Sequence, residues 1–449
     1  MSDASGCPIP SLAQLESRIP AIESAPPEEI LNHQLNQIQE TLAYTAERSP
    51  YYRRLFRSRG IDARAFRGWE DLEALPLTAK DDLQAHNWEF LCVDFSRVVD
   101  VVATSGTTGR PIYIALTRAD LDRLAENEFK GFLCAGIAPE DTVLLAVTLD
   151  NMFVAGLAYG TGLMRLGAAV IRQGPGNALR HLHLMRELGV TGVVAVPSFL
   201  LEIARIARRE GLRPDTLGLK KAVLVGESIR NPDLSFNALG RQIQEAWGAR
   251  LFSSYGLTEA CTSMCECEAG QGGHLHPDLL LAEIVDDAGK PLGPHRVGEL
   301  VITTFGVEAM PLVRYRTGDV TFLMEGPCAC GRTAPRIGPI LGRKSQMIKL
   351  KGAQLYPGHI EECLREIPEV VNYQIEVFTG SNHSDRVVVH VGATERSQRV
   401  REAVQERIRA RARVTPEVSL EAPEVVHGRL FEGGSRKPRR FLDRRTKPA

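Results

Sequence analysis

Short apolar segments alternate with helical segments through the middle of the chain, and this alternation constrains the fold more than any other feature. The apolar segments, which are β-branched or otherwise hydrophobic, are Val143–Val147, Ala168–Ile171, Gly192–Val196, Ala222–Val225 and Arg250–Ser253. The segments predicted to be helices are Leu157–Leu166, Ala178–Leu188, Ser198–Glu210 and Ser235–Trp247. Strands that alternate with helices form parallel sheets covered on both faces. The sequence therefore predicts an α/β fold with mostly parallel sheets.

Two regions outside this alternation predict further structural parts. Between Leu280 and Met310 the predicted strands are short and separated by Gly/Pro turns, which indicates a smaller β-rich subdomain. Beyond Gly342–Ser345, strands and helices alternate over about 100 residues, which fits a small α+β domain. We therefore expect a flexible N-terminal segment (residues 1–28), a large N-terminal domain (residues 29–342) and a small C-terminal domain (residues 343–449).

The composition excludes several classes of protein. The chain of 449 residues is 43% hydrophobic and 24% charged, so it can bury sizeable cores. Its formal net charge of −1 provides no general attraction to nucleic acid or to an anionic membrane. Its first residues lack a signal-peptide pattern, and no uncharged apolar run approaches the roughly 18 residues of a membrane span. We expect a cytoplasmic protein and leave its oligomeric state open, a homodimer included.

A segment rich in glycine and threonine follows the β-branched run from Val98 to Val102. It consists of Ser105, Gly106, Thr107, Thr108 and Gly109. Glycine lets the backbone approach a ligand closely, and hydroxyl groups with free backbone N–H groups form a concave site that suits phosphate. The segment lacks the Gly-Lys-Ser/Thr ending of a Walker A loop. A polar hairpin turn is the structural alternative.

Three further motifs follow in order. They are Ser254-Tyr255-Gly256-Leu257-Thr258-Glu259, Tyr315-Arg316-Thr317-Gly318-Asp319 and Gly342-Arg343. Together with the Gly/Thr segment, they resemble the AMP-forming acyl-CoA synthetase superfamily, and within it the phenylacetate–CoA ligase-like branch. The resemblance implies a mobile C-terminal domain. It also implies a ligase that uses ATP and Mg²⁺ to convert an aromatic acid into an acyl-adenylate and then transfers the acyl group to coenzyme A.

The resemblance implies roles for the residues of these motifs. The Gly/Thr segment would hold phosphate, Tyr255 would lie against adenine, and Thr258 would meet phosphate. Glu259 would hold Mg²⁺, for which a carboxylate oxygen is a suitable ligand; outside such a motif it would be an ordinary surface carboxylate. Asp319 would bind the ribose hydroxyls, and Arg343 would meet ribose or phosphate.

A second adenine-lining loop follows the predicted strand Ala222–Val225. Gly226, Glu227 and Ser228 occupy the position that lines the adenine site in the family, and ligands bind at the carboxyl ends of such strands. A turn with a serine N-cap of a helix is the alternative. This loop and the residues Ser254, Tyr255 and Gly256 complete the predicted nucleotide site.

The C-terminal tail carries a candidate catalytic lysine. Arg440-Phe441-Leu442-Asp443 resembles the Arg-x-x-Asp ending of the family and makes Lys437 the matching lysine. Arg436 and Pro438 replace the small residues that usually flank this lysine. The alternative is a disordered basic arm, because the tail from Gly433 contains seven Lys/Arg and one Asp.

Cysteines and a histidine form a separate cluster. Cys267, His274, Cys328 and Cys330 fit a tetrahedral zinc site, and some members of the phenylacetate ligase branch have a similar set. Four protein ligands leave no open position, so the zinc would be structural. Cys261 or Cys265 could replace Cys267, and buried unligated thiols are the alternative.

The acid-binding segment of the family matches the region around Asn151, Phe153 and Gly156. Phe153 would form an aromatic wall, or belong to the core. Because Asn151 and Met152 stand where aromatic residues are usual, the acid need not be phenylacetate itself. The alternatives to coenzyme A are a carrier-protein thiol or an amine. A non-catalytic nucleotide-binding protein of the same fold is the third hypothesis, and the joint presence of the motif residues argues against it.

Overall fold

The computed structural model describes residues 12–104, 111–350, 353–380, 385–412, 414–432 and 438–445. The chain divides into two compact units. The second unit contains Leu341–Ala449 together with the short segments Asn237–Leu239 and Gly318–Val320, and the first unit contains the rest.

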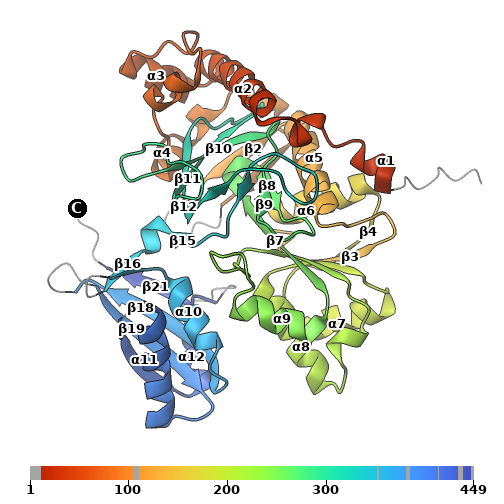
Figure 1. The fold of residues 1–449 in the computed structure, drawn as a ribbon, viewed down its shortest axis with the longest axis vertical. Coiled ribbons are helices and arrows are strands. Elements are labelled where there is room, and N and C mark those ends of the chain that lie inside the picture. Colours follow the sequence, from red (N-terminus) through yellow and green to blue (C-terminus); the bar gives the residue numbers. More distant parts are fainter. Residues whose placement is uncertain are drawn as a thin grey trace, which may run out of the picture. The chain divides into compact units, whose positions relative to one another are not determined.

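A six-stranded sheet forms the centre of the first unit (Figure 1). Its strands are β3 (Thr142–Ala146), β4 (Ala169–Arg172), β5 (Gly192–Ala195), β6 (Lys221–Val225), β7 (Arg250–Leu257) and β8 (Thr262–Cys265). The order is β4-β3-β5-β6-β7-β8, in which β3 to β7 run parallel and β8 returns antiparallel to β7. The mostly parallel sheet predicted from the alternation is confirmed.

Helices cover this sheet on both sides. They are α5 (Arg118–Cys134), α6 (Val154–Leu166), α7 (Ala178–Glu187), α8 (Pro197–Arg209) and α9 (Ala238–Trp247). Figure 1 shows α5 and α6 on one side and the other three on the opposite side. Side chains of a strand alternate between its faces: Val143 and Leu145 of β3 pack in one core with Phe129 of α5 and Leu163 of α6.

Shorter sheets form the β-rich part of the first unit. The strands are β1 (Asp100–Ala103), β2 (Tyr113–Leu116), β9 (Gly273–His274), β10 (Leu280–Val285), β11 (Gly298–Thr304), β12 (Tyr315–Thr321), β13 (Leu323–Met324) and β14 (Arg336–Ile337). The residues Gly318–Val320 of β12 belong to the second unit. β10 pairs antiparallel with β11, β1 with β2, and β14 with both β13 and β9. Adjacent strands that run antiparallel agree with the β-rich subdomain that the Gly/Pro turns predict.

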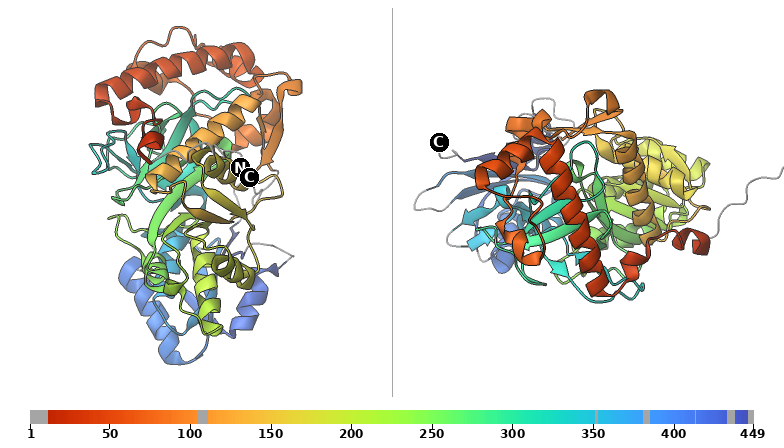
Figure 2. Two further views of the ribbon diagram at one scale, coloured as in Figure 1. Left: turned by 90° about the vertical axis from the view of Figure 1, so that its right-hand side faces the viewer. Right: turned by 90° about the horizontal axis from the view of Figure 1, so that it is seen from above.

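The N-terminal helices pack on this β-rich part. They are α1 (Leu12–Glu16), α2 (Pro27–Arg48), α3 (Pro50–Arg59) and α4 (Lys80–His86). Figure 2 shows α2 as a long helix that crosses the β-rich strands, and Gln34 of α2 donates to the carbonyl of Leu280 in β10 at 3.0 Å. Among the described residues, the helices are all too short or too polar to span a bilayer.

The N-terminal segment differs from the flexible segment expected for residues 1–28. Leu15 and Glu23 are fully buried, and the backbone carbonyl of Glu23 accepts bonds from the N–H groups of Thr333 and Ala334 at 3.0 and 3.1 Å. Residues 12–28 therefore pack within the first unit through a buried leucine and a buried charged side chain. Residues 1–11 lie outside the described part of the chain.

The second unit is a four-stranded sheet with helices and a core of its own. Its strands β18 (Val370–Phe378), β19 (Arg386–Ala393), β20 (Glu417–Glu421) and β21 (Phe441–Arg444) have the order β20-β19-β18-β21. Its other elements are β15 (Gly342–Arg343), β16 (Ile348–Leu350), β17 (Ala353–Leu355), α10 (Pro357–Arg365), α11 (Gln398–Ala412) and α12 (Pro423–Leu430). Ile375 and Val389 pack with α10 and α11.

Candidate functional site

Glu259 lies just beyond the end of β7, where parallel sheets bind ligands. Ser254, Tyr255 and Gly256 belong to β7 itself, and Thr258 opens a short 3-10 helix that carries Glu259. The carboxylate of Glu259 is buried, and its Oε1 accepts a bond from the hydroxyl of Tyr315 at 3.4 Å. Tyr315 begins the second motif found in the sequence. The fold therefore brings together two motifs that are 56 residues apart.

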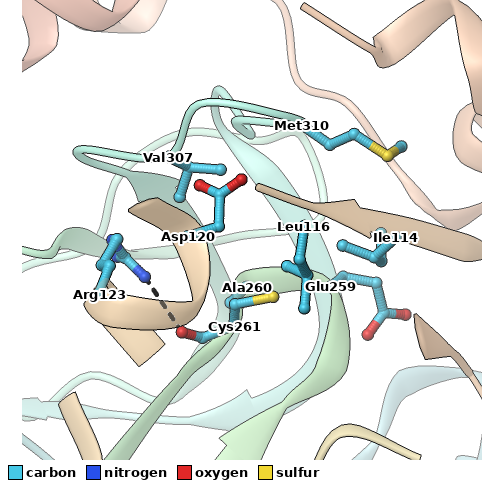
Figure 3. Close-up of a pocket in the computed structure, with 9 residues that line it drawn as sticks. All are labelled: Ile114, Leu116, Asp120, Arg123, Glu259, Ala260, Cys261, Val307 and Met310. Atoms are coloured by element: carbon cyan, nitrogen blue, oxygen red, sulfur yellow. Dashed lines mark hydrogen bonds between the residues drawn. The ribbon is translucent and has the colours of Figure 1, made fainter. Parts of the chain in front are cut away.

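The strand after the Gly/Thr segment lies beside Glu259. Ile114 and Leu116 of β2 line the same pocket as Glu259, together with Met310 (Figure 3). β1 and β2 pair antiparallel, with Ala103 opposite Tyr113. The predicted phosphate-binding residues Ser105 to Gly109 lie outside the described residues. The strands on either side of them form a hairpin, and the second of these strands is next to the candidate Mg²⁺ ligand.

The predicted acid-binding segment has an unusual backbone. Asn151 and Met152 both have a φ of 58°, a conformation that non-glycine residues rarely adopt. The carbonyl of Met152 accepts a bond from the N–H of Ala103 at 2.8 Å, which ties this segment to β1. Two consecutive strained residues are costly and persist where the surroundings hold them. They place Phe153 immediately before α6.

Gly156 has a structural explanation. A Cβ atom at this position would lie 2.5 Å from the carbonyl oxygen of Thr148, so only glycine lets α6 approach the end of β3 this closely. The role in acid binding predicted from the sequence stays a prediction beside this packing requirement.

Glu227 and Ser228 make local bonds in the loop after β6. The carboxylate of Glu227 accepts bonds from the N–H and the hydroxyl of Ser198 at 2.9 and 3.0 Å, so it caps the first turn of α8. The hydroxyl of Ser228 donates to the carbonyl of Arg230 at 3.0 Å. Gly226 turns the chain with a φ of 81°. The turn expected as the alternative is present, but the cap is made by Glu227 on the preceding helix α8 and not by Ser228.

Asp319 and Arg343 form an ion pair within the second unit. They stand opposite each other on β12 and β15, and Nε of Arg343 donates to Oδ1 of Asp319 at 3.0 Å. The carboxylate is buried, whereas about half of the arginine side chain is exposed. The pairing orients a carboxylate with an adjacent cation, which is an arrangement suited to a ribose phosphate.

Lys437 lies outside the described residues, but the motif after it is ordered. Phe441 to Arg444 form β21, which runs parallel to β18 with Asp443 opposite Val377. The guanidinium of Arg440 lies 5.9 Å from the ring centroid of Tyr373. Residues Phe441 to Arg444 therefore belong to the sheet of the second unit.

The structure brings together the four predicted zinc ligands. One ligand atom each from Cys267, His274, Cys328 and Cys330 lies within 4.8 Å of the other three. The Sγ atoms of Cys267 and Cys328 are 3.6 Å apart, and Sγ of Cys330 lies 3.5 Å from Nε2 of His274. Bonding from the Cys267 thiol and from His274 lowers the pKa of Cys330, although burial opposes this. Cys261 is not in the cluster, and its thiol donates to the carbonyl of Thr258.

The two halves of this cluster come from separate loops. Cys267 follows β8 and His274 is in β9, while the cysteine pair occupies a turn between β13 and β14. Within this turn, Gly331 has a φ of 92° and donates to the carbonyl of Cys328. β9 pairs with β14, so that His274 stands opposite Arg336. This pairing explains how ligands more than fifty residues apart in sequence converge.

A buried network of charges, which the sequence analysis missed, adjoins the cluster. Glu23 accepts from Arg332 Nε at 3.0 Å and contacts His276 at 2.8 Å and Lys130 at 3.5 Å. Burial raises the pKa of Glu23, but His276, Lys130 and Arg332 together lower it to about 2. Lys130 also pairs with Asp278 at 2.6 Å. In the sequence, Lys130 within the apolar run around Phe129 is a signal for this network.

Comparisons with known proteins agree with these observations. The AMP-binding enzyme family model matches residues 79–309, and the AMP-binding enzyme C-terminal domain model matches residues 352–445. Phenylacetate-coenzyme A ligase of Thermus thermophilus is 38% identical over 364 residues, which are 80% of this chain and 80% of that protein. The ligase of the same name from Escherichia coli is 31% identical over 388 residues, with coverages of 85% and 86%.

A solved structure has the same fold. The crystal structure of 2-hydroxyisobutyryl-CoA ligase in the postadenylation state, in complex with 2-HIB-AMP, aligns with a TM-score of 0.84 and 24% identity. The alignment covers 99% of this chain and 95% of that chain. Both matched domains and the identity along most of the chain lead to one assignment. The chain belongs to the AMP-binding, adenylate-forming enzyme family, in its phenylacetate–CoA ligase-like branch.

Proposed function

We propose that the protein is an ATP-dependent, AMP-forming ligase that activates an aromatic carboxylic acid and transfers it to coenzyme A. The observation that carries this proposal is the bond from Tyr315 to Glu259, because it joins two separate motifs beside the hairpin that flanks the Gly/Thr segment. The relatives that cover most of the chain are named phenylacetate–CoA ligases, which supports both the aromatic acid and the acceptor.

The first step joins two anions, so the protein has to offset their repulsion. Glu259 would hold Mg²⁺, which supplies positive charge beside the phosphates, and a buried carboxylate is a suitable hard ligand. Ser105 to Gly109 would surround the phosphates with donors. Asp319 and Arg343 would hold the ribose, and Lys437 would contact the α-phosphate during attack by the acid.

In each of the two steps of the proposed reaction, one bond forms as another breaks. The carboxylate oxygen of the acid bonds to the α-phosphorus of ATP, and diphosphate leaves with the electron pair of the broken bond. In the second step, the thiol sulfur of coenzyme A bonds to the acyl carbon, loses its proton and displaces AMP. Phe153, held by the strained residues before it, would contact the aromatic part of the acid.

We also propose a structural zinc ion at Cys267, His274, Cys328 and Cys330. Zn–S bonds of about 2.3 Å and Zn–N bonds of about 2.0–2.1 Å in a tetrahedron place two sulfurs about 3.8 Å apart and a sulfur and a nitrogen about 3.6 Å apart. The observed separations of 3.6 and 3.5 Å fit this geometry. The separation of the two sulfurs exceeds by far the roughly 2 Å of a disulfide.

The described cysteines form no disulfide with one another, which supports a cytoplasmic location.

A screen of aromatic acids tests the proposed function. Release of diphosphate from ATP is measured for each acid with and without coenzyme A, and the acyl product is identified by mass spectrometry. We expect an aryl or arylacetic acid to release diphosphate and to give a thioester when coenzyme A is present. Release of diphosphate without thioester formation would indicate a carrier-protein thiol or an amine as the acceptor. Absence of ATP turnover with all acids would support the non-catalytic alternative.

A further inference from the structure

One face of the sheet in the second unit is polar where the other is apolar. Ile375 and Val389 face the core with α10 and α11, and side chains alternate along a strand. The intervening residues Gln374, Glu376 and His390 are nearly buried as well. Gln374 and Glu376 bond to residues of α12 and β21, and His390 contacts Glu376, so these three polar side chains lie on the opposite face of the sheet.

Gln374 joins the two ends of the chain segment between α12 and β21. Its Nε2 donates to the carbonyl of Arg429 at 3.3 Å and to the carbonyl of Arg439 at 2.8 Å. The N–H of Arg439 also donates to the carbonyl of Leu430 at 2.8 Å. The backbone at the two ends of this segment is therefore held together by three hydrogen bonds.

His390 links the carboxylates that orient two arginines. Its Nε2 lies 3.0 Å from Oε2 of Glu376, and its Nδ1 lies 2.7 Å from Oε1 of Glu421. The other oxygen of Glu376 accepts from Nε of Arg444 at 2.8 Å, and the other oxygen of Glu421 accepts from Nε of Arg429 at 3.2 Å. Each arginine is thus fixed through Nε, which leaves its two Nη groups to point elsewhere.

A cavity of about 290 Å³ lies between these arginines. It is lined by Arg429, Glu432, Arg439, Leu442 and Arg444. The lining residues all belong to the second unit. Three guanidinium groups and one carboxylate therefore converge on a space large enough for a small polyanion. Guanidinium groups bind phosphate oxygens in pairs and keep their charge at any physiological pH.

We propose that this cavity binds inorganic diphosphate, the leaving group of the adenylation step. The inference rests on the proposed function, because it uses the assignment of Lys437. Arg439 is two residues after Lys437 in the sequence, and covalent geometry limits their Cα separation to about 7 Å. Arg439 therefore stays near the lysine that is proposed to act in the reaction that releases diphosphate.

Diphosphate fits the lining better than a single phosphate does. Two phosphate groups offer enough oxygens for Arg429, Arg439 and Arg444 at once, whereas one phosphate group would engage fewer of their paired Nη donors. Glu432 repels a fully ionised anion at the same place. It should weaken binding, which lets diphosphate leave after each turnover.

The test measures binding of inorganic diphosphate to the full chain by titration calorimetry without ATP. We expect Arg439→Gln to raise the Kd at least tenfold, and Glu432→Gln to lower it. Among the described residues, Arg439 makes its hydrogen bonds through backbone atoms, so its side chain can change without loss of these bonds. Arg444→Gln is the second variant. Arg386→Gln is the matched control, because Arg386 pairs with Glu417 on the surface of the same unit.

Three results would overturn the proposal. The first is an equal Kd for diphosphate in the wild type and in all these variants. The second is an equal weakening of inorganic monophosphate and diphosphate, which would indicate a general anion site. The third is weaker binding of coenzyme A with unchanged binding of diphosphate, because the phosphates of coenzyme A would then be the ligand.

Failure of the diphosphate proposal can be distinguished from failure of the proposed function. Calorimetric binding requires no turnover, so it decides the role of the cavity even if Lys437→Ala retains adenylation. In active enzyme, isotope exchange between diphosphate and ATP gives a second readout. We expect the KM for diphosphate to rise in Arg439→Gln while the KM for the acid stays the same.

Discussion

Glu128 illustrates how far a single buried residue can depart from its usual chemistry. It lies on α5, and its Oε2 accepts a bond from the hydroxyl of Ser263 in β8 at 3.0 Å. Burial raises the pKa of Glu128 to about 8, although the bond from Ser263 opposes this. The carboxyl group is therefore protonated at neutral pH, beside strand β8.

The raised pKa of Glu128 predicts a pH dependence of stability. Between the unfolded pKa of 4.5 and the folded pKa of about 8, the native protein holds a proton that the unfolded chain has lost. The contribution of Glu128 to the free energy of unfolding is complete below pH 4.5 and is lost as the pH rises through about 8. One proton accounts for up to about 1.4 kcal/mol per pH unit.

Glu128→Gln should remove this dependence, because the amide keeps the volume and an acceptor for Ser263. We expect the variant to be more stable than the wild type at pH 8 and similar at pH 4.5, as measured by urea denaturation. Asp122→Asn, an exposed residue of the same helix, is the matched control. A constant difference between variant and wild type across this range would contradict the raised pKa.

Lys437→Ala tests the residue on which adenylation is proposed to depend. The lysine would stabilise charge on the α-phosphate only while the acid attacks. We expect a loss of at least a hundredfold in diphosphate release, with thioester formation from supplied acyl-adenylate retained. Lys349→Ala, an exposed lysine of the second unit, is the control. An equal loss in both half-reactions would remove Lys437 from this role.

At the scale of single residues, the sequence predicted the candidate site residues that can be recognised by their spacing along the chain. The cysteines and His274 were singled out because a tetrahedral zinc site prefers sulfur and nitrogen ligands. Glu23 and His390 were not found, because each depends on partners brought from other parts of the chain. Glu227 was assigned to adenine, and its bonds to Ser198 as a helix cap could not be foreseen from the sequence.

At the scale of elements, the sequence predicted those with a clear apolar pattern. The strands β3, β5 and β6 are apolar and buried over most of their length. Helix α5 was missed, because it buries Asn127, Glu128 and Lys130 and so lacks a purely apolar face. Strand β21 was missed as a strand, because its four residues contain two charges and its pairing with β18 is not local.

The proposed zinc would join the loop after β8 to the turn between β13 and β14. We expect about one zinc per chain by elemental analysis, and Cys330→Ser should lose most of it and lower the melting temperature by several degrees. Cys330 is exposed, so its replacement removes little packing. A lower melting temperature would therefore come from loss of the metal. Cys261→Ser should keep the zinc. Protein made without chelator that contains no metal would reduce the cluster to ordinary thiols.

At the scale of the whole molecule, the chain contains separate hydrophobic cores. Ile302 of β11 belongs to a core of the first unit, and Ile375 of β18 belongs to the core of the second unit. The core of the second unit contains only residues from Ile348 onward. The sequence indicated the boundary between the two units because the alternation of strands and helices restarts after Gly342–Ser345. The contribution of Gly318–Val320 to the second unit could not be predicted, because it depends on the pairing of β12 with β15.

Separate cores predict two unfolding transitions in calorimetry, since two-state behaviour fails for chains with several domains. Ile302→Ala and Ile375→Ala remove the same atoms from positions that are each almost completely buried. Each should cost about 2–5 kcal/mol in its own core. We expect Ile302→Ala to lower only the transition of the first unit and Ile375→Ala only that of the second. ATP, which would bind mainly through Glu259 and the Gly/Thr segment, should raise the first transition more. If both variants shifted a single transition by the same amount, the two units would unfold as one cooperative body.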